Sequence, residues 1–224
     1  HGTLGWTHVA GSIDNPALTG RGSFADVIQE ATLRERLHAL NPGPSHLNGG
    51  KPWLDEARLS EAVAAITRLG TRKPMEANEK ATELLTKGLT VDGLPGWDGG
   101  RGQTIRYIDW DTPANNRFTV VSQYRVDCPP GFDSAKGFIV PDLVLLVNGM
   151  PMVVVECKSP SIPEPMADAV DQLRRYSNQR KAAFEVDDNE GNEALFTTNQ
   201  LLIATCMDDA RVGCVGAAFE HYAQ

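Results

Sequence analysis

The sequence has no excess of positive charge, few cysteines and no long apolar run. Lys and Arg number 21 against 29 Asp and Glu in 224 residues, a formal net charge of −8. Affinity for nucleic acid that depends on charge alone needs cations that neutralise phosphates. The balance therefore argues against such a binder, although a local basic groove or an acidic site that meets DNA through a metal ion stays open. A chain that is 41% hydrophobic and 22% charged is also not disordered, collagen-like or a coiled coil.

Other absences narrow the class further. The four cysteines form no CxxC pair, and neither they nor the five histidines have the spacing of zinc ligands, which favours reduced thiols in a cytoplasmic protein. No apolar run approaches the about 18 residues of a membrane span, and no signal-peptide pattern opens the chain. The phosphate loop G-x-x-x-x-G-K-[ST] is missing, so we expect this chain neither to bind nor to hydrolyse ATP.

The periodicity of apolar residues predicts an α/β fold in a single domain over residues 1–224. In residues 1–100 the spacing is helical and predicts helices over 24–40, 59–69 and 78–87, with a glycine-rich loop over 92–102. From residue 104 the period changes to two. It predicts a hairpin of 104–110 with 117–127, strands over 142–147, 152–158, 201–206 and 211–215, and a helix over 165–184. Residues 101–216 are thus expected to form a mixed sheet flanked by helices, with a helical region before it.

Three ionisable residues interrupt the most apolar strands. Asp142 begins one strand, and Glu156 and Lys158 end the next. Burying an unpaired charge is energetically costly. Charged residues in such apolar strands therefore indicate a binding partner or a functional role. Two converging carboxylates repel each other unless a cation joins them, and hard oxygen ligands favour Mg²⁺. We expect a magnesium site in which Lys158 orients a water or stabilises developing charge.

The other interpretation is that these charges are only the solvated ends of two strands. The register decides between the two. If Asn148-Gly149 is a plain two-residue turn, Asp142 faces Val155, and the two carboxylates lie on opposite faces of the sheet. A three-residue loop or one bulge places Asp142 opposite Glu156. The metal-site hypothesis therefore predicts a connection other than a plain two-residue turn, against the usual meaning of Asn-Gly.

Pro141-Asp142 followed by Glu156-Cys157-Lys158 resembles the PD-(D/E)xK nuclease motif. The longer run IVPDLVLLVNGMPMVVVECKSP resembles the amino-terminal nuclease domain of the restriction subunit of type I restriction–modification enzymes. The similarity covers most of the chain and includes YIDWD at 107–111, NNRF at 115–118, VVSQ at 120–123, LLI at 201–203 and RVG at 211–213. It implies a restriction-endonuclease-like core and hydrolysis of DNA phosphodiester bonds.

The resemblance also implies roles for single residues. Asp142 and Glu156 become the metal-binding carboxylates, the main-chain carbonyl of Cys157 a further ligand, and Lys158 the catalytic lysine. Gln172 and Tyr176 become the QxxxY pair of the family, which is physically reasonable because positions i and i+4 share one helical face. The alternatives are that Tyr176 packs in the core and that the cations Arg174, Arg175, Arg180 and Lys181 form a solvated face instead of touching phosphates.

Partners follow from the same resemblance. The restriction subunits of the family carry a helicase motor that uses ATP, which is absent here, and they assemble with modification (methyltransferase) and specificity subunits on double-stranded DNA. We expect the nuclease module of such an enzyme. One alternative is a non-catalytic scaffold that joins the motor to the modification complex, and another is a self-standing nuclease of the same fold.

Overall fold

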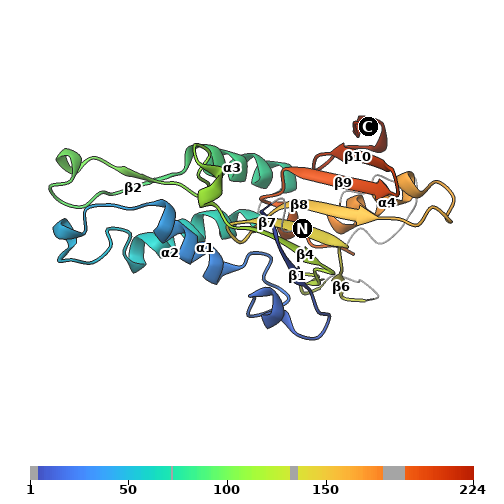
Figure 1. Cartoon of the computed structure of the whole chain (residues 1–224), viewed down its shortest axis with the longest axis horizontal. Helices are drawn as coiled ribbons and strands as arrows, with labels where there is room; N and C mark the ends of the chain where they lie inside the picture. The colour runs from blue at the N-terminus through green and yellow to red at the C-terminus, as the bar shows by residue number, and fades with distance from the viewer. Residues whose placement is uncertain (1–4, 72, 132–135, 179–189) are drawn as a thin grey trace.

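The computed structural model describes residues 5–71, 73–131, 136–178 and 190–224, and places a helical part beside a sheet (Figure 1). The helical part contains α1 (Glu30–Leu40), α2 (Glu56–Thr67) and α3 (Pro74–Lys87), followed by the two-stranded hairpin of β2 (Leu89–Val91) and β3 (Gln103–Ile105). Short 3-10 helices lie at Pro16–Thr19, Ser45–Asn48, Arg68–Thr71, Asp98–Gly100, Pro113–Asn115, Glu193–Phe196 and Phe219–His221. Among the described helices, none has the length and apolar character that a membrane crossing requires.

The sheet has six strands in the order β1-β4-β7-β8-β9-β10 and is mixed. Its strands are β1 (Thr7–Ala10), β4 (Phe118–Ser122), β7 (Leu143–Val147), β8 (Met150–Cys157), β9 (Leu201–Cys206) and β10 (Asp209–Gly213). The pairs β1–β4 and β8–β9 are parallel, and the other three neighbouring pairs are antiparallel. A separate two-stranded pair joins β5 (Val126–Asp127) to β6 (Phe138–Ile139). The expected mixed sheet flanked by helices is confirmed.

Helix α4 (Pro165–Tyr176) packs against β8 and β9, behind the strands in the view of Figure 1. Its buried residues Met166, Ala169, Val170 and Leu173 join Val144, Leu146, Val154, Leu202 and Ala204 of the sheet in one apolar cluster. A second cluster fills the helical part and includes Met150 and Met152 from the start of β8. Side chains alternate along a strand, so the even-numbered residues at the end of β8 share the α4 face with Val154.

Several elements differ from the sequence expectations, and α1 begins at Glu30 instead of residue 24. Residues 104–110 and 117–127 do not pair, because β3 pairs with β2 and β4 lies between β1 and β7. The first segment is instead drawn into the helical part, where the Tyr107 hydroxyl donates a 2.7 Å hydrogen bond to the Ala62 carbonyl. Residues 7–10, expected among helices and loops, form the edge strand β1. Helix α4 ends at Tyr176, and residues 179–184 of the expected helix lie outside the described residues.

Candidate metal-binding and catalytic site

A β-bulge in the β7–β8 hairpin sets the register of the candidate site. Val147 pairs with Met150 across Asn148 and Gly149, whose φ angles of 52° and 84° suit a two-residue turn. The connection thus has two residues, so the expected departure from a two-residue connection is wrong, and of the two arrangements that would shift the register the three-residue loop is absent. The register then shifts: Leu146 pairs with Pro151, but Leu145 pairs with Val153, so Met152 is the extra residue of the bulge. Beyond it Leu143 pairs with Val155, and the next residues along the two strands are Asp142 and Glu156.

Pro151 is the sequence signal for this bulge. Proline has no N–H to donate to a neighbouring strand, so in sheets it is confined to edge strands, first positions and bulges. Here it stands second in an eight-residue strand, next to the extra residue Met152 and before Val153, where pairing with β9 begins. The register change that the metal-site hypothesis requires is therefore present, and the proline marks where it occurs.

Asp142 is bound to the end of β8 through its side chain. Its Oδ2 accepts a 2.8 Å hydrogen bond from the main-chain N–H of Cys157, and its Oδ1 accepts one of 3.1 Å from Nε2 of Gln123. The Gln123 main-chain N–H donates to the Asp142 carbonyl at 2.8 Å. The Cys157 side chain is exposed, and by strand alternation it points to the face away from Glu156. Cys157 therefore contributes only main-chain groups here.

Glu156 is a buried carboxylate with incomplete hydrogen bonding. Only 3% of the residue is exposed. Its Oε1 lies 3.3 Å from Nζ of Lys158, whereas Oε2 has no hydrogen-bond partner among the residues that the structure describes. Burial, and next the nearby Asp142 carboxylate, raise the pKa of Glu156 to about 7. An unpaired buried carboxylate oxygen is energetically unfavourable, and it is the kind of donor that a divalent cation would satisfy.

Helix α4 supplies the rest of the site. The Lys158 ammonium donates to Oε1 of Gln172 and lies 3.0 Å from Oδ2 of Asp168. Gln172 in turn donates through Nε2 to the Tyr176 hydroxyl at 2.5 Å, and that hydroxyl lies 3.2 Å from the Val140 carbonyl, to which it can donate. Burial, and next the Glu156 carboxylate, raise the pKa of the Tyr176 phenol. The structure thus brings Asp142, Glu156, Lys158, Gln172 and Tyr176 into one connected cluster.

The donor set contains two acidic side chains. No group of three or more His, Cys, Asp or Glu side chains suited to a metal ion forms within the described ranges. Two carboxylates and a main-chain carbonyl nevertheless suit Mg²⁺, which keeps several of its own waters. The unpaired oxygen of Glu156 is the structural observation that makes the site fit a cation.

Comparisons with known proteins show the family of this chain. The family model "Type I restriction enzyme R protein N terminus" matches residues 2–221, which include both the helical part and the sheet. The chain belongs to this family. It is 28% identical over 223 residues to the type I restriction enzyme HindI endonuclease subunit of Haemophilus influenzae, covering 98% of this chain and 18% of the relative.

Two relatives of this R-protein N-terminal region come from Methanocaldococcus jannaschii. They carry the names "Putative type I restriction enzyme MjaIXP endonuclease subunit" and "Putative type I restriction enzyme MjaVIIIP endonuclease subunit". The first is 24% identical over 74% of this chain and 15% of its own length, and the second is 22% identical over 81% and 15%. The chain thus spans less than a fifth of the length of each of these relatives.

Asp168 and Gln123 contact the site of this R-protein region although the sequence did not single them out for it. Asp168 is the one on α4. It precedes Gln172 by four residues and Tyr176 by eight, so the three share one face of α4. That spacing was readable in the sequence. What it could not show is that this face meets Lys158, because the contact depends on how α4 packs on β8.

Other charged groups of the R-protein region form ion pairs outside this cluster, although Arg175 lines a cavity together with Gln172 and Tyr176. On α4, the guanidinium of Arg175 lies 3.3 Å from the Asp171 carboxylate and 3.7 Å from the Glu190 carboxylate. Two acidic side chains therefore partly neutralise this cation. Arg180 and Lys181 lie outside the described residues. In the helical part, Glu35 forms a 2.6 Å ion pair with Arg117.

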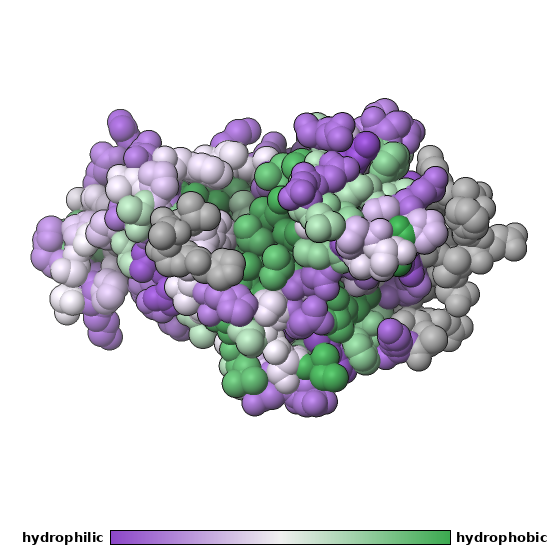
Figure 2. Space-filling model, turned by 45° about the vertical axis from the view of Figure 1, so that its right-hand side comes forward, coloured by the Kyte–Doolittle hydropathy of each residue, from purple (hydrophilic) through white to green (hydrophobic). Residues whose placement is uncertain are grey.

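Apolar surface gathers near the middle of the face in Figure 2, with hydrophilic residues around it.

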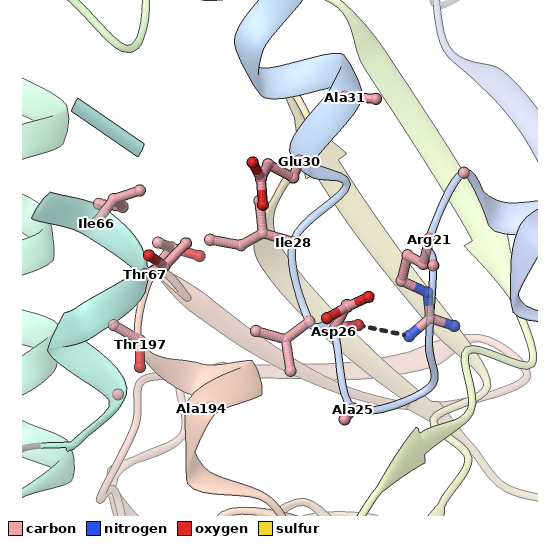
Figure 3. Close-up of a pocket in the computed structure, with 15 residues that line it drawn as sticks. Arg21, Ala25, Asp26, Ile28, Glu30, Ala31, Ile66, Thr67, Ala194 and Thr197 are labelled. Atoms are coloured by element: carbon pink, nitrogen blue, oxygen red, sulfur yellow. Dashed lines mark hydrogen bonds between the residues drawn. The ribbon is translucent and has the colours of Figure 1, made fainter. Parts of the chain in front are cut away.

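A cavity of about 450 Å³ lies elsewhere, between the helical part and the loop that precedes α1. Figure 3 shows Ile66 and Thr67 of α2 on one side and Asp26 and Ile28 on the other. The nearby Arg21 donates to the Asp26 carbonyl at 3.0 Å. None of the site residues that the sequence predicts lines this cavity. We therefore expect catalysis at the cluster beside α4 and not in this cavity.

Proposed function

We propose that this chain is the endonuclease module of a type I restriction enzyme, and that it hydrolyses DNA phosphodiester bonds with a divalent metal ion in a restriction-endonuclease-like, PD-(D/E)xK core. The observation that carries the proposal is the meeting of Asp142, Glu156 and Lys158 on one face of the sheet, with one oxygen of Glu156 left unpaired. The names of the relatives as endonuclease subunits support it.

In this proposal Asp142, Glu156 and the main-chain carbonyl of Cys157 hold the ion, with magnesium as the physiological metal. When bound, such an ion polarises a phosphoryl oxygen and lowers the pKa of its water. Lys158 supplies an ammonium that orients the attacking water or stabilises the charge that develops on the phosphate. Gln172 contacts Lys158 directly, and Tyr176 holds Gln172 from the next turn of α4. Both are therefore placed to fix the position of the ammonium.

The wider assembly belongs to the same proposal. The module acts in the cytoplasm on double-stranded DNA, together with modification (methyltransferase) and specificity subunits, while ATP is used by motor domains of the longer subunit. The net charge of −8 agrees with a module that is brought to DNA by other parts of the enzyme, because charge-driven affinity requires an excess of cations.

One contact suits the alternative of a non-catalytic scaffold. The Lys158 ammonium lies against Glu156, and such an ion pair can close a site that binds no metal. The scaffold interpretation gives no reason for the second oxygen of Glu156 to be buried without a partner, and for this reason we favour the enzyme.

The test is cleavage by the complete restriction subunit assembled with its partner subunits. Asp142→Ala, Glu156→Ala and Lys158→Ala should each lower the rate of ATP-dependent DNA cleavage by about 10³-fold or more while ATP hydrolysis continues, because charge stabilisation at the reacting phosphate is lost. Asp171→Asn, a charge change on α4 outside the cluster, is the matched control. Cleavage that persists in the three variants would refute the nuclease, and a joint loss of ATP hydrolysis and assembly would favour the scaffold.

A further inference from the structure

Among the residues that the structure describes, the Lys158 ammonium has oxygen neighbours on three different side chains. Glu156 Oε1 lies at 3.3 Å and Asp168 Oδ2 at 3.0 Å, and Gln172 Oε1 accepts a hydrogen bond. An ammonium has three N–H donors, so these contacts can use its whole donor capacity. The roles proposed above account for Glu156 and Gln172 and leave Asp168 without one.

We propose that Asp168 is a positioning residue that draws the Lys158 ammonium toward α4 and so keeps the Glu156 carboxylate available to a divalent cation. The inference rests on the proposed function of this site. It concerns how the Lys158 ammonium and a divalent cation from solution share the buried carboxylate of Glu156.

The two carboxylates that contact Lys158 differ strongly in exposure. The Glu156 side chain is 4% exposed and the Asp168 side chain 47%. Attraction between charges is much stronger in a buried, weakly screened environment than at the surface. Without a competing partner, Lys158 would therefore settle on Glu156, its remaining carboxylate neighbour. A divalent cation would then have to displace the ammonium, or bind beside a like charge.

Asp168 is well placed to be that competing partner. It lies one turn before Gln172, so both hold Lys158 from the same face of α4. The buried residues Met166, Ala169, Val170 and Leu173 fix the helix against the sheet. Asp168 can thus act on the ammonium from a rigid support.

A simpler role for Asp168 is to stabilise the helix. It is an acidic residue in the first turn of α4, where a negative charge interacts favourably with the helix dipole. Such a role would change the stability of the protein when Asp168 is replaced, but it would not act on cation binding through Lys158. A double-mutant cycle with Lys158 separates the two roles.

The experiment measures Mn²⁺ binding to the 224-residue chain by electron paramagnetic resonance, without DNA or nucleotide. We expect Asp168→Asn to weaken Mn²⁺ binding about tenfold, which is within the range of coupling between residues in contact. Asp168→Glu should restore most of the affinity. The control Asp171→Asn makes the same charge change three residues further along α4, at a similar side-chain exposure of 49%, and should stay within about twofold of wild type.

The decisive experiment repeats the comparison in variants that also carry Lys158→Met. Its readout is Mn²⁺ affinity and not cleavage, because Lys158 is part of the proposed catalytic machinery. There Asp168→Asn should change the affinity less than about twofold, since the competing ammonium is gone. A tenfold loss that persists in this background would show that Asp168 acts through its own charge and would overturn the inference. Equal affinities of the Asp168→Asn and Asp171→Asn variants would overturn it as well.

Failure of the proposed function has a different signature. If Glu156→Gln leaves Mn²⁺ binding at the wild-type value, the ion does not occupy this site, and the nuclease proposal and the role of Asp168 fall together. If Glu156→Gln abolishes binding but Asp168→Asn has no effect, only the role of Asp168 falls. Unfolding midpoints of each variant verify that the affinities refer to folded protein.

Discussion

Replacing Glu156 by glutamine should stabilise this protein at alkaline pH, because the native carboxylate is buried with only a partial counter-charge. Burial and the neighbouring Asp142 raise the native pKa of Glu156 to about 7, above its ordinary value of 4.5. Below pH 4.5 the carboxyl is protonated in both states and costs nothing. Between about pH 4.5 and 7 the native state binds a proton that the unfolded state releases, so the free energy of unfolding falls as the pH rises.

The size of the effect follows from these two values. One pH unit corresponds to about 1.4 kcal/mol, so the raised native pKa of Glu156 lowers the free energy of unfolding by about 3 kcal/mol at pH 8 and by about 1 kcal/mol at pH 5. Glutamine is uncharged and escapes this cost, but it gives up the attraction to Lys158 at 3.3 Å. We therefore expect the advantage of Glu156→Gln in free energy of unfolding to grow by about 2 kcal/mol between pH 5 and pH 8.

The assay is urea unfolding at pH 5 and pH 8 in buffer that contains a chelator. Glu220→Gln, at an exposed glutamate, is the control and should change stability equally at the two pH values. Adding Mg²⁺ at pH 8 should stabilise the wild type more than Glu156→Gln, since ligand that binds the native state raises its stability. A difference between Glu156→Gln and wild type that does not depend on pH would refute the reasoning.

Two further changes test the hairpin and the α4 network. Gly149→Ala should lower the free energy of unfolding by about 2 kcal/mol more than Gly96→Ala in urea titrations. Both glycines have positive φ, but a Cβ at Gly149 would lie 2.7 Å from the Gln29 carbonyl oxygen, whereas a Cβ at Gly96 would face open space. Equal losses would contradict the proposed close approach. Tyr176→Phe keeps the ring but removes a hydroxyl with two contacts, and should slow DNA cleavage by the complete enzyme about tenfold. Tyr222→Phe is its control, since that hydroxyl has no hydrogen-bond partner among the described residues; a Tyr176→Phe rate equal to that of the control would remove Tyr176 from the site.

The central strands were readable from the sequence because burial on both faces leaves a continuous apolar run. Residues 201–206 form β9 with the expected bounds, and β7 and β8 differ from expectation by one or two residues at their ends. The ends of the helices were harder to predict from the sequence, since they depend on capping residues. Helix α2 begins after Asp55, whose side chain accepts from the Arg58 N–H at 3.1 Å, three residues before the apolar spacing predicts a helix.

The pairing of strands was harder to predict than their positions. Residues 104–110 alternate like a strand, but Ile105 and Tyr107 are fully or almost fully buried in the helical part. Asn148 reinforces that placement: its buried amide donates to the Tyr107 carbonyl at 2.9 Å, and its Oδ1 accepts from the Arg117 N–H at 2.8 Å. Such contacts join residues that are far apart in the sequence. A periodicity in one segment carries no information about them.

The site residues were predictable by type, whereas their convergence depends on a single extra residue. Asp142 lies five residues before Val147, but Glu156 lies six residues after Met150. The turn end of the hairpin is fixed where Gly149 accepts from the Gln29 N–H at 2.9 Å, and the other end is fixed where Asp142 accepts from the Cys157 N–H. With both ends fixed, the unequal lengths must be absorbed between them. They are absorbed by the extra residue Met152, which directly follows Pro151, a residue type confined in sheets to edges, first positions and bulges. The bulge brings the carboxylates of Asp142 and Glu156 to the same face of the sheet.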